Sequence, residues 1–298
     1  MRIAISGSRG LVGSGLIKSF ERESHEILHL VRREARPEAH EIEWHPNGGK
    51  MNAADLEGLG AVINLAGESI AEGRWTDEKK RRIYDSRVKG TQLLSNALAS
   101  LTQKPATFLC ASATGFYGNR GDQILDETAP AGSGFLAKVC RDWEQATEAA
   151  NQAGIRVVNL RFGPILAREG GMLDKMLTPF KLGVGGKVGS GEQFISWVAI
   201  DDVVAAIKLA LSDTSLRGPI NIVSPNPVTN EEFTKTLGHV LNRPTALAVP
   251  AFAARLAFGE MADEMLLVSQ RVVPKKLQEL KFAFQYSELD SAFRQYIL

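Results

Sequence analysis

Three glycines spaced three residues apart near the amino terminus constrain this chain more than any other feature. Gly7, Gly10 and Gly13 follow an apolar run that predicts a β-strand, and an amphipathic helical pattern comes directly after them. In this order, one glycine makes a tight turn, a second lets a pyrophosphate approach the backbone, and a third lets the helix pack on the strand. The pattern predicts dinucleotide binding. The alternative is a turn that only joins a strand to a helix.

The helix after this turn begins with backbone N–H groups that have no partner within the helix, and they suit a pyrophosphate. We therefore expect the whole turn to contact the ligand. Its residues are Gly7, Ser8, Arg9, Gly10, Leu11, Val12 and Gly13.

The end of the second predicted strand, residues 25–32, decides which dinucleotide the chain prefers. Proteins of this fold that use NAD usually carry an acidic residue there, which accepts hydrogen bonds from the ribose hydroxyls. This chain carries Arg32 and Arg33 instead, and two guanidinium groups match the oxygens of a 2′-phosphate. Arg9 is a third candidate for the same clamp. The pattern predicts NADP (NADPH) as the cofactor, and the alternative is a solvated basic strand end.

Strands alternate with helices along the rest of the chain, which predicts an α/β fold with a Rossmann-type, doubly wound parallel sheet. Further strands are expected at residues 41–45, 61–67, 107–112, 156–163 and 219–224, and helices at 76–100 and 135–152. We expect residues 1–165 to form the NADP-binding domain, to which the strand near 219–224 returns. Residues 166–298 are expected to form a smaller, partly helical substrate region, with helical patterns dominating from residue 230 onward.

Small residues at the end of the strand over residues 61–67 would let the backbone approach the sugars of the cofactor. Leu65, Ala66 and Gly67 are therefore expected cofactor neighbours. The loop that follows carries Glu68 and Arg74, a mixture that suits the orientation of a substrate and equally suits an exposed surface loop.

Three further sequence patterns, one charged, one glycine-rich and one apolar, indicate local structure. The charge run over residues 79–82 predicts a solvated helix face. The glycine-rich stretch 183–191 is typical of a flexible lid or substrate loop. Phe252, Leu256 and Phe258 are interpreted as packing residues.

Composition narrows the class of protein and its partners. A net charge of +1 gives no reason to expect a nucleic acid or an acidic membrane surface. Two cysteines indicate neither a disulfide framework nor a metal cage, and the five histidines lack metal-ligand spacing, so no metal is expected. The chain shows no apolar run long enough to span a bilayer and starts with a core strand rather than a signal peptide. We expect a cytoplasmic protein.

Several motifs together resemble the extended short-chain dehydrogenases/reductases, the superfamily that includes the nucleotide-sugar epimerases. They are Gly7-x-x-Gly10-x-x-Gly13, Asn64-Leu65-Ala66-Gly67, Gly90-Thr91, Tyr117-Gly118 and residues 197–202. More narrowly, Ala66-Gly67-Glu68 and the stretches 112–118 and 183–191 look like the atypical subgroup called epimerase-family proteins. The resemblance implies a Rossmann domain, NADP and a cleft closed by the C-terminal portion, and it supplies no known substrate.

The resemblance also implies a Tyr-x-x-x-Lys pair, in which the tyrosine moves a proton while a hydride passes to or from the nicotinamide. Lys138 matches the lysine and is also a candidate ligand of the cofactor ribose, but Gly134 stands at the tyrosine position. Ala113 replaces the Ser or Thr that helps to hold the substrate oxygen, and Arg87 replaces an asparagine of the long helix. The standard proton relay therefore cannot operate.

Two hypotheses follow. In the first, the chain is an NADP-dependent oxidoreductase or epimerase of a small-molecule substrate, which can be nucleotide-linked, and other groups do the work. The candidate catalytic residues are then Ser112, Thr114, Tyr117 and Lys138. In the second, catalysis is lost and the chain is an NADP(H)-binding regulator or scaffold. A homodimer is compatible with both hypotheses.

Two further sets of residues are expected near the cofactor. Arg87 suits the cofactor phosphates or the nicotinamide ribose, and the alternative is a solvent-facing helix arginine. Phe162, Gly163 and Pro164 come where the fold usually contacts the nicotinamide end.

Overall fold

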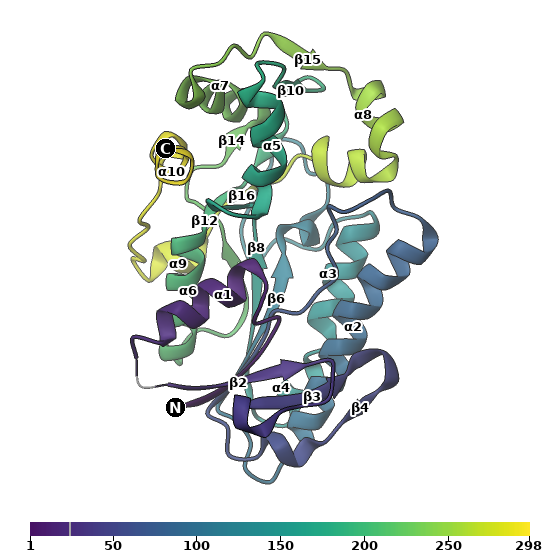
Figure 1. The fold of residues 1–298 in the computed structure, drawn as a ribbon, viewed down its shortest axis with the longest axis vertical. Helices are drawn as coiled ribbons and strands as arrows, with labels where there is room; N and C mark the ends of the chain where they lie inside the picture. Colours follow the sequence, from purple (N-terminus) through teal and green to yellow (C-terminus); the bar gives the residue numbers. More distant parts are fainter. Residues whose placement is uncertain (24) are drawn as a thin grey trace. The chain divides into compact units, whose positions relative to one another are not determined.

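The structure is a computed structural model that describes residues 1–23 and 25–298 (Figure 1). The chain forms two compact units, each assembled from three segments. Unit 1 comprises Met1–Ser112, Val139–Leu160 and Ile207–Ile220. Unit 2 comprises Ala113–Lys138, Arg161–Ala206 and Asn221–Leu298. The chain passes between the two units repeatedly, because several strands and helices continue from one unit into the other. The predicted division has fewer crossings, since it separates residues 1–165 and a returning strand near 219–224 from the rest of residues 166–298.

An eight-stranded sheet with the strand order β13-β8-β6-β5-β1-β2-β3-β4 is the core of the α/β fold. The strands are β1 (Arg2–Ser6), β2 (Glu26–Val31), β3 (Glu41–His45), β4 (Lys50–Met51), β5 (Ala61–Asn64), β6 (Thr107–Ala113), β8 (Arg156–Phe162) and β13 (Gly218–Ile222). β1 pairs in parallel with β2 on one side and with β5 on the other, and β3 pairs antiparallel with β4. The strand order therefore reverses at β1, which makes this the topological switch point of the sheet and confirms the predicted Rossmann-type fold.

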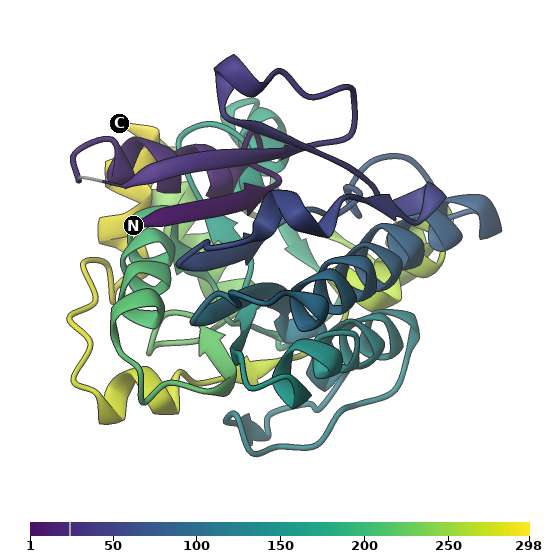
Figure 2. The ribbon, with the colours of Figure 1, turned by 90° about the horizontal axis from the view of Figure 1, so that it is seen from below.

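Helices cover both faces of the sheet in unit 1. They are α1 (Leu11–Phe20), α2 (Asp77–Ser100), α4 (Glu148–Gln152), most of α3 (Phe135–Gln145) and the end of α6 (Ile200–Ser212). Figures 1 and 2 show α1 and α6 on one face and α2 with α3 on the other. Short 3₁₀ helices lie at Pro37–Ala39, Pro46–Gly48 and Ala53–Leu56.

Two helix boundaries follow from local side-chain chemistry. Thr76 caps α2, because its hydroxyl accepts a hydrogen bond from the Lys79 N–H at 3.2 Å, which confirms the predicted start. The helix predicted over residues 135–152 is instead two helices. Between them the Thr147 hydroxyl donates to the carbonyl of Glu144 at 2.7 Å, a local bond that competes with continued α-helix.

Unit 2 contains helices and small two-stranded sheets. Besides the start of α6, the helices are α5 (Gly171–Lys181), α7 (Asn230–Leu241), α8 (Ala251–Phe258), α9 (Lys275–Glu279) and α10 (Leu289–Ile297), with a 3₁₀ turn at Thr114–Tyr117 and a π-helical turn at Ala262–Leu266. The sheets pair β7 (Ile124–Leu125) with β16 (Arg271–Val272), β9 (Ile165–Leu166) with β12 (Val198–Ala199), β10 (Gly186–Val188) with β15 (Leu247–Val249), and β11 (Phe194–Ile195) with β14 (Val228–Thr229). Phe233 of α7 and Phe293 of α10 pack edge to face in its core, with ring centroids 5.0 Å apart.

Two features of this C-terminal region bear on what the sequence predicts. Helices dominate after residue 230, as expected, and the short strands β15 and β16 between them each pair with a strand far away in the sequence. The glycine-rich stretch includes strand β10, where a Cβ on Gly186 would collide with the carbonyl oxygen of Leu247. A glycine is needed there for close strand packing, so its presence is not evidence of a flexible lid.

The aromatic and aliphatic residues of α8 do not pack as expected. Phe252 is 72% exposed, Leu256 77% and Phe258 42%. The helix has eight residues and buries only Ala254 among them. These side chains therefore contribute apolar surface rather than core.

No helix in residues 1–23 and 25–298 is long and apolar enough to cross a membrane. Nor do these residues gather three or more His, Cys, Asp or Glu side chains in a group that could hold a metal ion.

Candidate cofactor site

The glycine turn after β1 needs glycines for two different reasons. Gly7 has a φ of +68°, and a Cβ there would lie 2.8 Å from the carbonyl carbon of Leu65. A Cβ on Gly13 would lie 2.8 Å from Cα of Ser8 and would collide with the Gly7 carbonyl oxygen. Gly10 precedes α1, whose first turn has no side-chain cap. The turn thus packs tightly against the end of β5 and leaves the first N–H groups of α1 open to an anion.

A buried polar network holds the residues after β5 in place. The Ser6 hydroxyl donates to Asn64 Oδ1 at 2.6 Å, and the Asn64 amide donates to Thr91 Oγ1 at 2.8 Å. Ser6 Oγ also accepts from the N–H groups of Leu65 and Ala66, at 3.1 and 3.2 Å. The predicted contacts of Leu65 and Ala66 with a cofactor therefore do not involve these N–H groups. Sequence reasoning missed the role of Ser6 and Thr91, although a polar residue inside an apolar strand was a usable signal.

A cavity of about 840 Å³ lies at this end of the sheet in unit 1. It is large enough for a dinucleotide-sized ligand. Its walls come from the glycine turn, the ends of β2 and β3, the residues after β5, and one side of α2. The lining residues are Gly7, Ser8, Arg9, Gly10, Leu30, Val31, Arg32, Arg33, Trp44, Pro46, Leu65, Ala66, Gly67, Glu68, Arg81, Arg82, Asp85 and Ser86. Ten of the predicted site residues therefore lie around one space, and Leu11, Val12 and Gly13 continue from its wall into α1.

The three arginines predicted to bind a 2′-phosphate all line this cavity, but their surroundings differ. The Arg33 guanidinium pairs with Glu41 and donates to the carbonyl of Glu34 at 2.8 Å. Hydrogen bonds from Arg36 and then from Arg33 lower the pKa of Glu41 to about 2. Arg9 and Arg32 are exposed, and no ion pair joins either of them to another described residue. Arg33 is thus shared with a carboxylate, whereas Arg9 and Arg32 are available to a ligand.

Arg87 lies behind the cavity wall rather than in solvent. Its Nη1 donates to the carbonyl oxygens of Glu68 at 3.0 Å and Ile83 at 3.2 Å, and its guanidinium lies 5.2 Å from the ring centroid of Trp143. A Cβ on Gly67 would lie 3.2 Å from the guanidinium carbon. Burial lowers the pKa of Arg87. This arginine contacts the backbone of the wall, so any effect on a cofactor would pass through Gly67 and Glu68.

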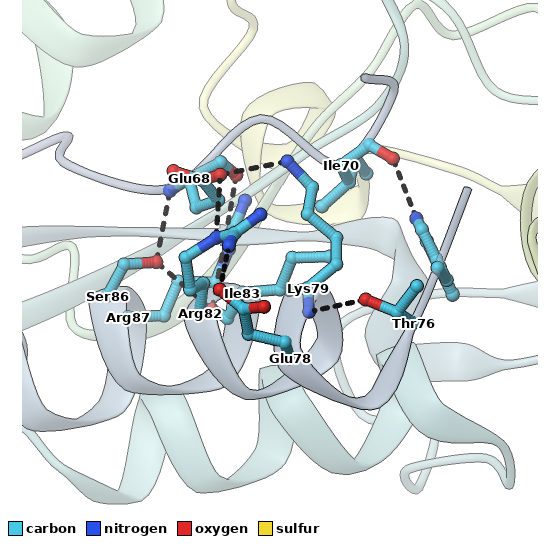
Figure 3. A network of polar contacts seen from close by, with 10 residues as sticks. Glu68, Ile70, Thr76, Glu78, Lys79, Arg82, Ile83, Ser86 and Arg87 are labelled. Atoms are coloured by element: carbon cyan, nitrogen blue, oxygen red, sulfur yellow. Dashed lines mark hydrogen bonds and ion pairs between the residues drawn. The ribbon is translucent and has the colours of Figure 1, made fainter. Parts of the chain in front are cut away.

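Glu68, predicted to orient a substrate, lies in the loop before α2 and is the centre of a polar network with side chains of that helix (Figure 3). Its Oε1 accepts from Lys79 Nζ at 2.8 Å and lies 3.6 Å from Arg82 Nε. The bond from Lys79 is the main reason that the pKa of Glu68 is lowered. Arg74, the second predicted substrate residue, is exposed in the loop before α2, where its carbonyl accepts from the Thr76 N–H at 3.1 Å. The charge run at 79–82 is therefore not simply a solvated face, because Lys79 is buried and Arg81 and Arg82 line the cavity.

The predicted catalytic hydroxyl of Ser112 is directed into unit 1. Ser112 is 2% exposed and donates to Glu144 Oε1 at 2.7 Å. In unit 2, Thr114 is buried in the 3₁₀ turn that follows β6, and Lys138 is exposed on α3.

Tyr117 does not fit the role of a catalytic acid. It is fully buried, its hydroxyl donates to Asn221 Oδ1 at 2.7 Å, and the same oxygen accepts from Arg161 Nη1 at 2.9 Å. Burial raises the pKa of Tyr117 to about 12. A buried hydroxyl with its donor and acceptor roles both filled does not meet a substrate, so Tyr117 leaves the catalytic set.

Gly134 stands at the position of the family's catalytic tyrosine, and the Glu264 carboxylate lies against it. This glycine has a φ of +107°, and a Cβ there would collide with Glu264 Oε1. The Glu264 carboxylate accepts from the N–H groups of Phe135 at 2.9 Å and Leu136 at 3.0 Å, which caps the amino terminus of α3. A tyrosine at residue 134 would therefore displace this carboxylate.

Phe162, Gly163 and Pro164, predicted near a nicotinamide, are tied into the backbone of unit 2. Phe162 ends β8 and is half-buried. The Gly163 N–H donates to the carbonyl of Ile222 at 3.1 Å, and the Pro164 carbonyl accepts from the Val198 N–H at 3.0 Å. Their contact with a nicotinamide stays a prediction.

The strand order, the glycine turn and the cavity at the switch point define a protein with a Rossmann-type fold. The chain belongs to the NAD dependent epimerase/dehydratase family, whose model matches residues 3–222. Residues 249–296 match a second model, a domain of unknown function called DUF1731.

Relatives of known name match along almost the whole chain. An epimerase family protein of Mycobacterium bovis, Mb2239, is 43% identical over 290 residues, covering 97% of this chain and 95% of its own length. The epimerase family protein YfhF of Bacillus subtilis is 35% identical over 301 residues, covering 100% of this chain and 98% of its own. The crystal structure of human epimerase family protein SDR39U1 (isoform 2) with NADPH superposes with a TM-score of 0.89 at 30% identity, covering 99% of both chains. The predicted membership of the epimerase-family proteins is thus confirmed.

Proposed function

We propose that unit 1 binds NADPH in the 840 Å³ cavity. The observation that carries this proposal is the single space shared by the glycine turn, the arginines after β2 and the residues after β5. Ligands of open α/β sheets bind outside the carboxyl ends of the strands at the switch point, which is where these elements meet. The human relative crystallised with NADPH supports the same cofactor.

The pyrophosphate would bind at the uncapped first turn of α1, next to Gly10, Leu11 and Val12. The 2′-phosphate would bind Arg9 and Arg32. Arg33 would contribute less, because its guanidinium is ion-paired with Glu41. When bound, NADPH supplies a hydride, and the cavity wall of this chain holds and orients the dinucleotide.

Calorimetric titration with NADPH, NADP⁺, NADH and NAD⁺ tests the cofactor. We expect the two phosphorylated forms to bind at least tenfold more tightly than the other two, because a charge-assisted bidentate contact contributes more than 1.4 kcal/mol. Equal affinity for all four would contradict the role of the arginines, and no binding of any form would reject the proposal.

For the reaction, we propose NADP-dependent oxidoreductase or epimerase-like chemistry on a small hydroxylated or nucleotide-linked substrate, without a tyrosine relay. Lys138 is exposed at the position that matches the family lysine, and Gly134 leaves no tyrosine to accompany it. A screen of carbonyl compounds and nucleotide sugars that follows the absorbance of the reduced nicotinamide tests this proposal. Turnover of any substrate would support it.

A specific observation favours a second candidate, a non-catalytic NADP(H)-binding regulator. Glu264 fills the space next to Gly134, and the Tyr117 hydroxyl is bonded inside unit 2. Neither residue 134 nor Tyr117 therefore offers a hydroxyl that could transfer a proton to a substrate. Tight NADPH binding without turnover across a broad screen would favour the regulator.

A further inference from the structure

The cavity wall carries two carboxylates although the proposed ligand is strongly anionic. NADPH has about four negative charges at neutral pH, two on the pyrophosphate and close to two on the 2′-phosphate. Five arginines line the cavity, and so do Glu68 and Asp85. An uncompensated carboxylate near phosphate groups would repel them, so each of these acids needs a cationic partner.

Glu68 has such a partner in Lys79, at 2.8 Å. The Lys79 side chain is only 7% exposed, so this ammonium is largely removed from solvent and its charge is poorly screened. Arg82 is a weaker partner, because it lies 3.6 Å from Glu68, is half exposed, and donates to Glu78 at 2.6 Å. Figure 3 shows Lys79 and Arg82 approaching Glu68 from the same helix.

The backbone of Glu68 is held by the next turns of α2. Its N–H donates to Ser86 Oγ at 3.0 Å, and its carbonyl accepts from Arg87 Nη1 at 3.0 Å. Lys79, Arg82 and Ser86 follow the three- and four-residue spacing that places side chains on one face of a helix, and Arg87 comes directly after Ser86. Because its N–H and carbonyl groups are both hydrogen-bonded, the backbone of Glu68 is held in one position in the cavity wall.

We propose that Lys79 is a positioning residue for the cofactor, which neutralises Glu68 and so makes this wall acceptable to a phosphate-bearing ligand. Lys79 does not line the cavity, so it acts through Glu68. The inference rests on the proposed binding of NADPH and adds to it a residue that sequence patterning assigns to a solvated helix face. The Asp85–Lys89 pair, at 2.8 Å, is the exposed counterpart on the same helix and should matter less because water screens it.

A purely structural role for Lys79 predicts a different outcome from a charge-compensating one. If the pair only anchors the loop, loss of either partner or of both weakens binding. If Lys79 compensates charge, its loss alone leaves a bare carboxylate, and the additional loss of that carboxylate restores binding. The sign of the second substitution therefore separates the two roles.

The experiment titrates NADPH into the wild type, Lys79→Met, Glu68→Gln and the double variant at low and high salt, with thermal unfolding of each protein. We expect Lys79→Met to bind about tenfold more weakly at low salt, with a smaller loss at high salt. Glu68→Gln should bind at least as tightly as the wild type, and the double variant within about threefold of it. Lys235→Met, which breaks an exposed pair with Glu231 in unit 2, is the matched control and should change nothing.

Each outcome decides the matter. Binding by Lys79→Met as tight as wild type would overturn this inference and leave NADPH binding standing, whereas no binding by the wild type would reject both. A double variant as weak as Lys79→Met would show an anchor instead of charge compensation. If Lys79→Met does not fold, weaker binding by Glu68→Gln than by the wild type would still overturn the proposal.

Discussion

Two glycines, one in each unit, show how differently a motif position can be used. Gly7 in unit 1 and Gly134 in unit 2 both have positive φ values, +68° and +107°. At Gly7 the missing side chain lets the backbone turn against Leu65 beside a cavity lined by cations. At Gly134 it makes room for the Glu264 carboxylate, which caps a helix. The space beside the glycine turn thus stays open, whereas the space at the position that matches the family tyrosine is filled by the Glu264 carboxylate.

The largest expected effect breaks the glycine turn. In Gly13→Val, the new side chain meets Gly7 and Ser8 backbone, so α1 must move away from β1. We expect NADPH binding to weaken more than a hundredfold and the free energy of unfolding to fall by about 2–4 kcal/mol. Calorimetry and chemical denaturation measure both. Gly48→Ala is the control, because a Cβ there makes only an ordinary contact of 3.9 Å; near-normal binding by Gly13→Val would contradict the role of the turn.

Arg32→Asp should have the next largest effect, and only on one class of ligand. The substitution replaces a cation at the proposed 2′-phosphate position with an anion, so we expect NADPH affinity to fall about 30- to 100-fold and NADH affinity to change little. Titration of both nucleotides measures the difference. Arg22→Asp, an exposed residue after α1, serves as the matched charge reversal. An equal loss for both nucleotides would mean that Arg32 does not bind the 2′-phosphate.

Gly134→Tyr tests whether the space at residue 134 in unit 2 is filled by the Glu264 carboxylate. Restoring the family residue should lower the free energy of unfolding by about 1–3 kcal/mol, because the tyrosine displaces Glu264 and forces a side chain into a positive φ. NADPH binding by unit 1 should not change. Denaturation and calorimetry check both statements, and Gly134→Tyr combined with Glu264→Ala separates the collision from the backbone strain. Wild-type stability of Gly134→Tyr would show that the position is still open.

The smallest expected effect concerns Glu41, which competes for Arg33. In Glu41→Gln the anionic partner of Arg33 is removed, so this guanidinium becomes more available to the cavity. We expect NADPH affinity to rise by up to about threefold, and titration at low salt is the measurement. A fall in affinity would show instead that Glu41 orients Arg33 for the ligand.

Sequence patterns predicted those features whose cause is local. The strand, glycine turn and helix at residues 2–20 and the start of the helix predicted over residues 76–100 follow from neighbouring residues, and the structure confirms them. The break between α3 and α4 and the strand β15 were missed. The strand pairs with a segment about sixty residues away in the sequence, which no local pattern reveals.

The candidate site divides in the same way. The sequence by itself determined the Rossmann-type fold, the glycines of the turn and the arginines at the end of β2, because backbone conformation and strand position depend on short segments. Only the tertiary structure decided that Lys79 pairs with Glu68, that Glu41 engages Arg33, and that Glu264 lies against Gly134. Each of these outcomes depends on which charged group the folded backbone brings within a few ångströms of another residue, and the strength of an electrostatic interaction is set by that distance and by burial.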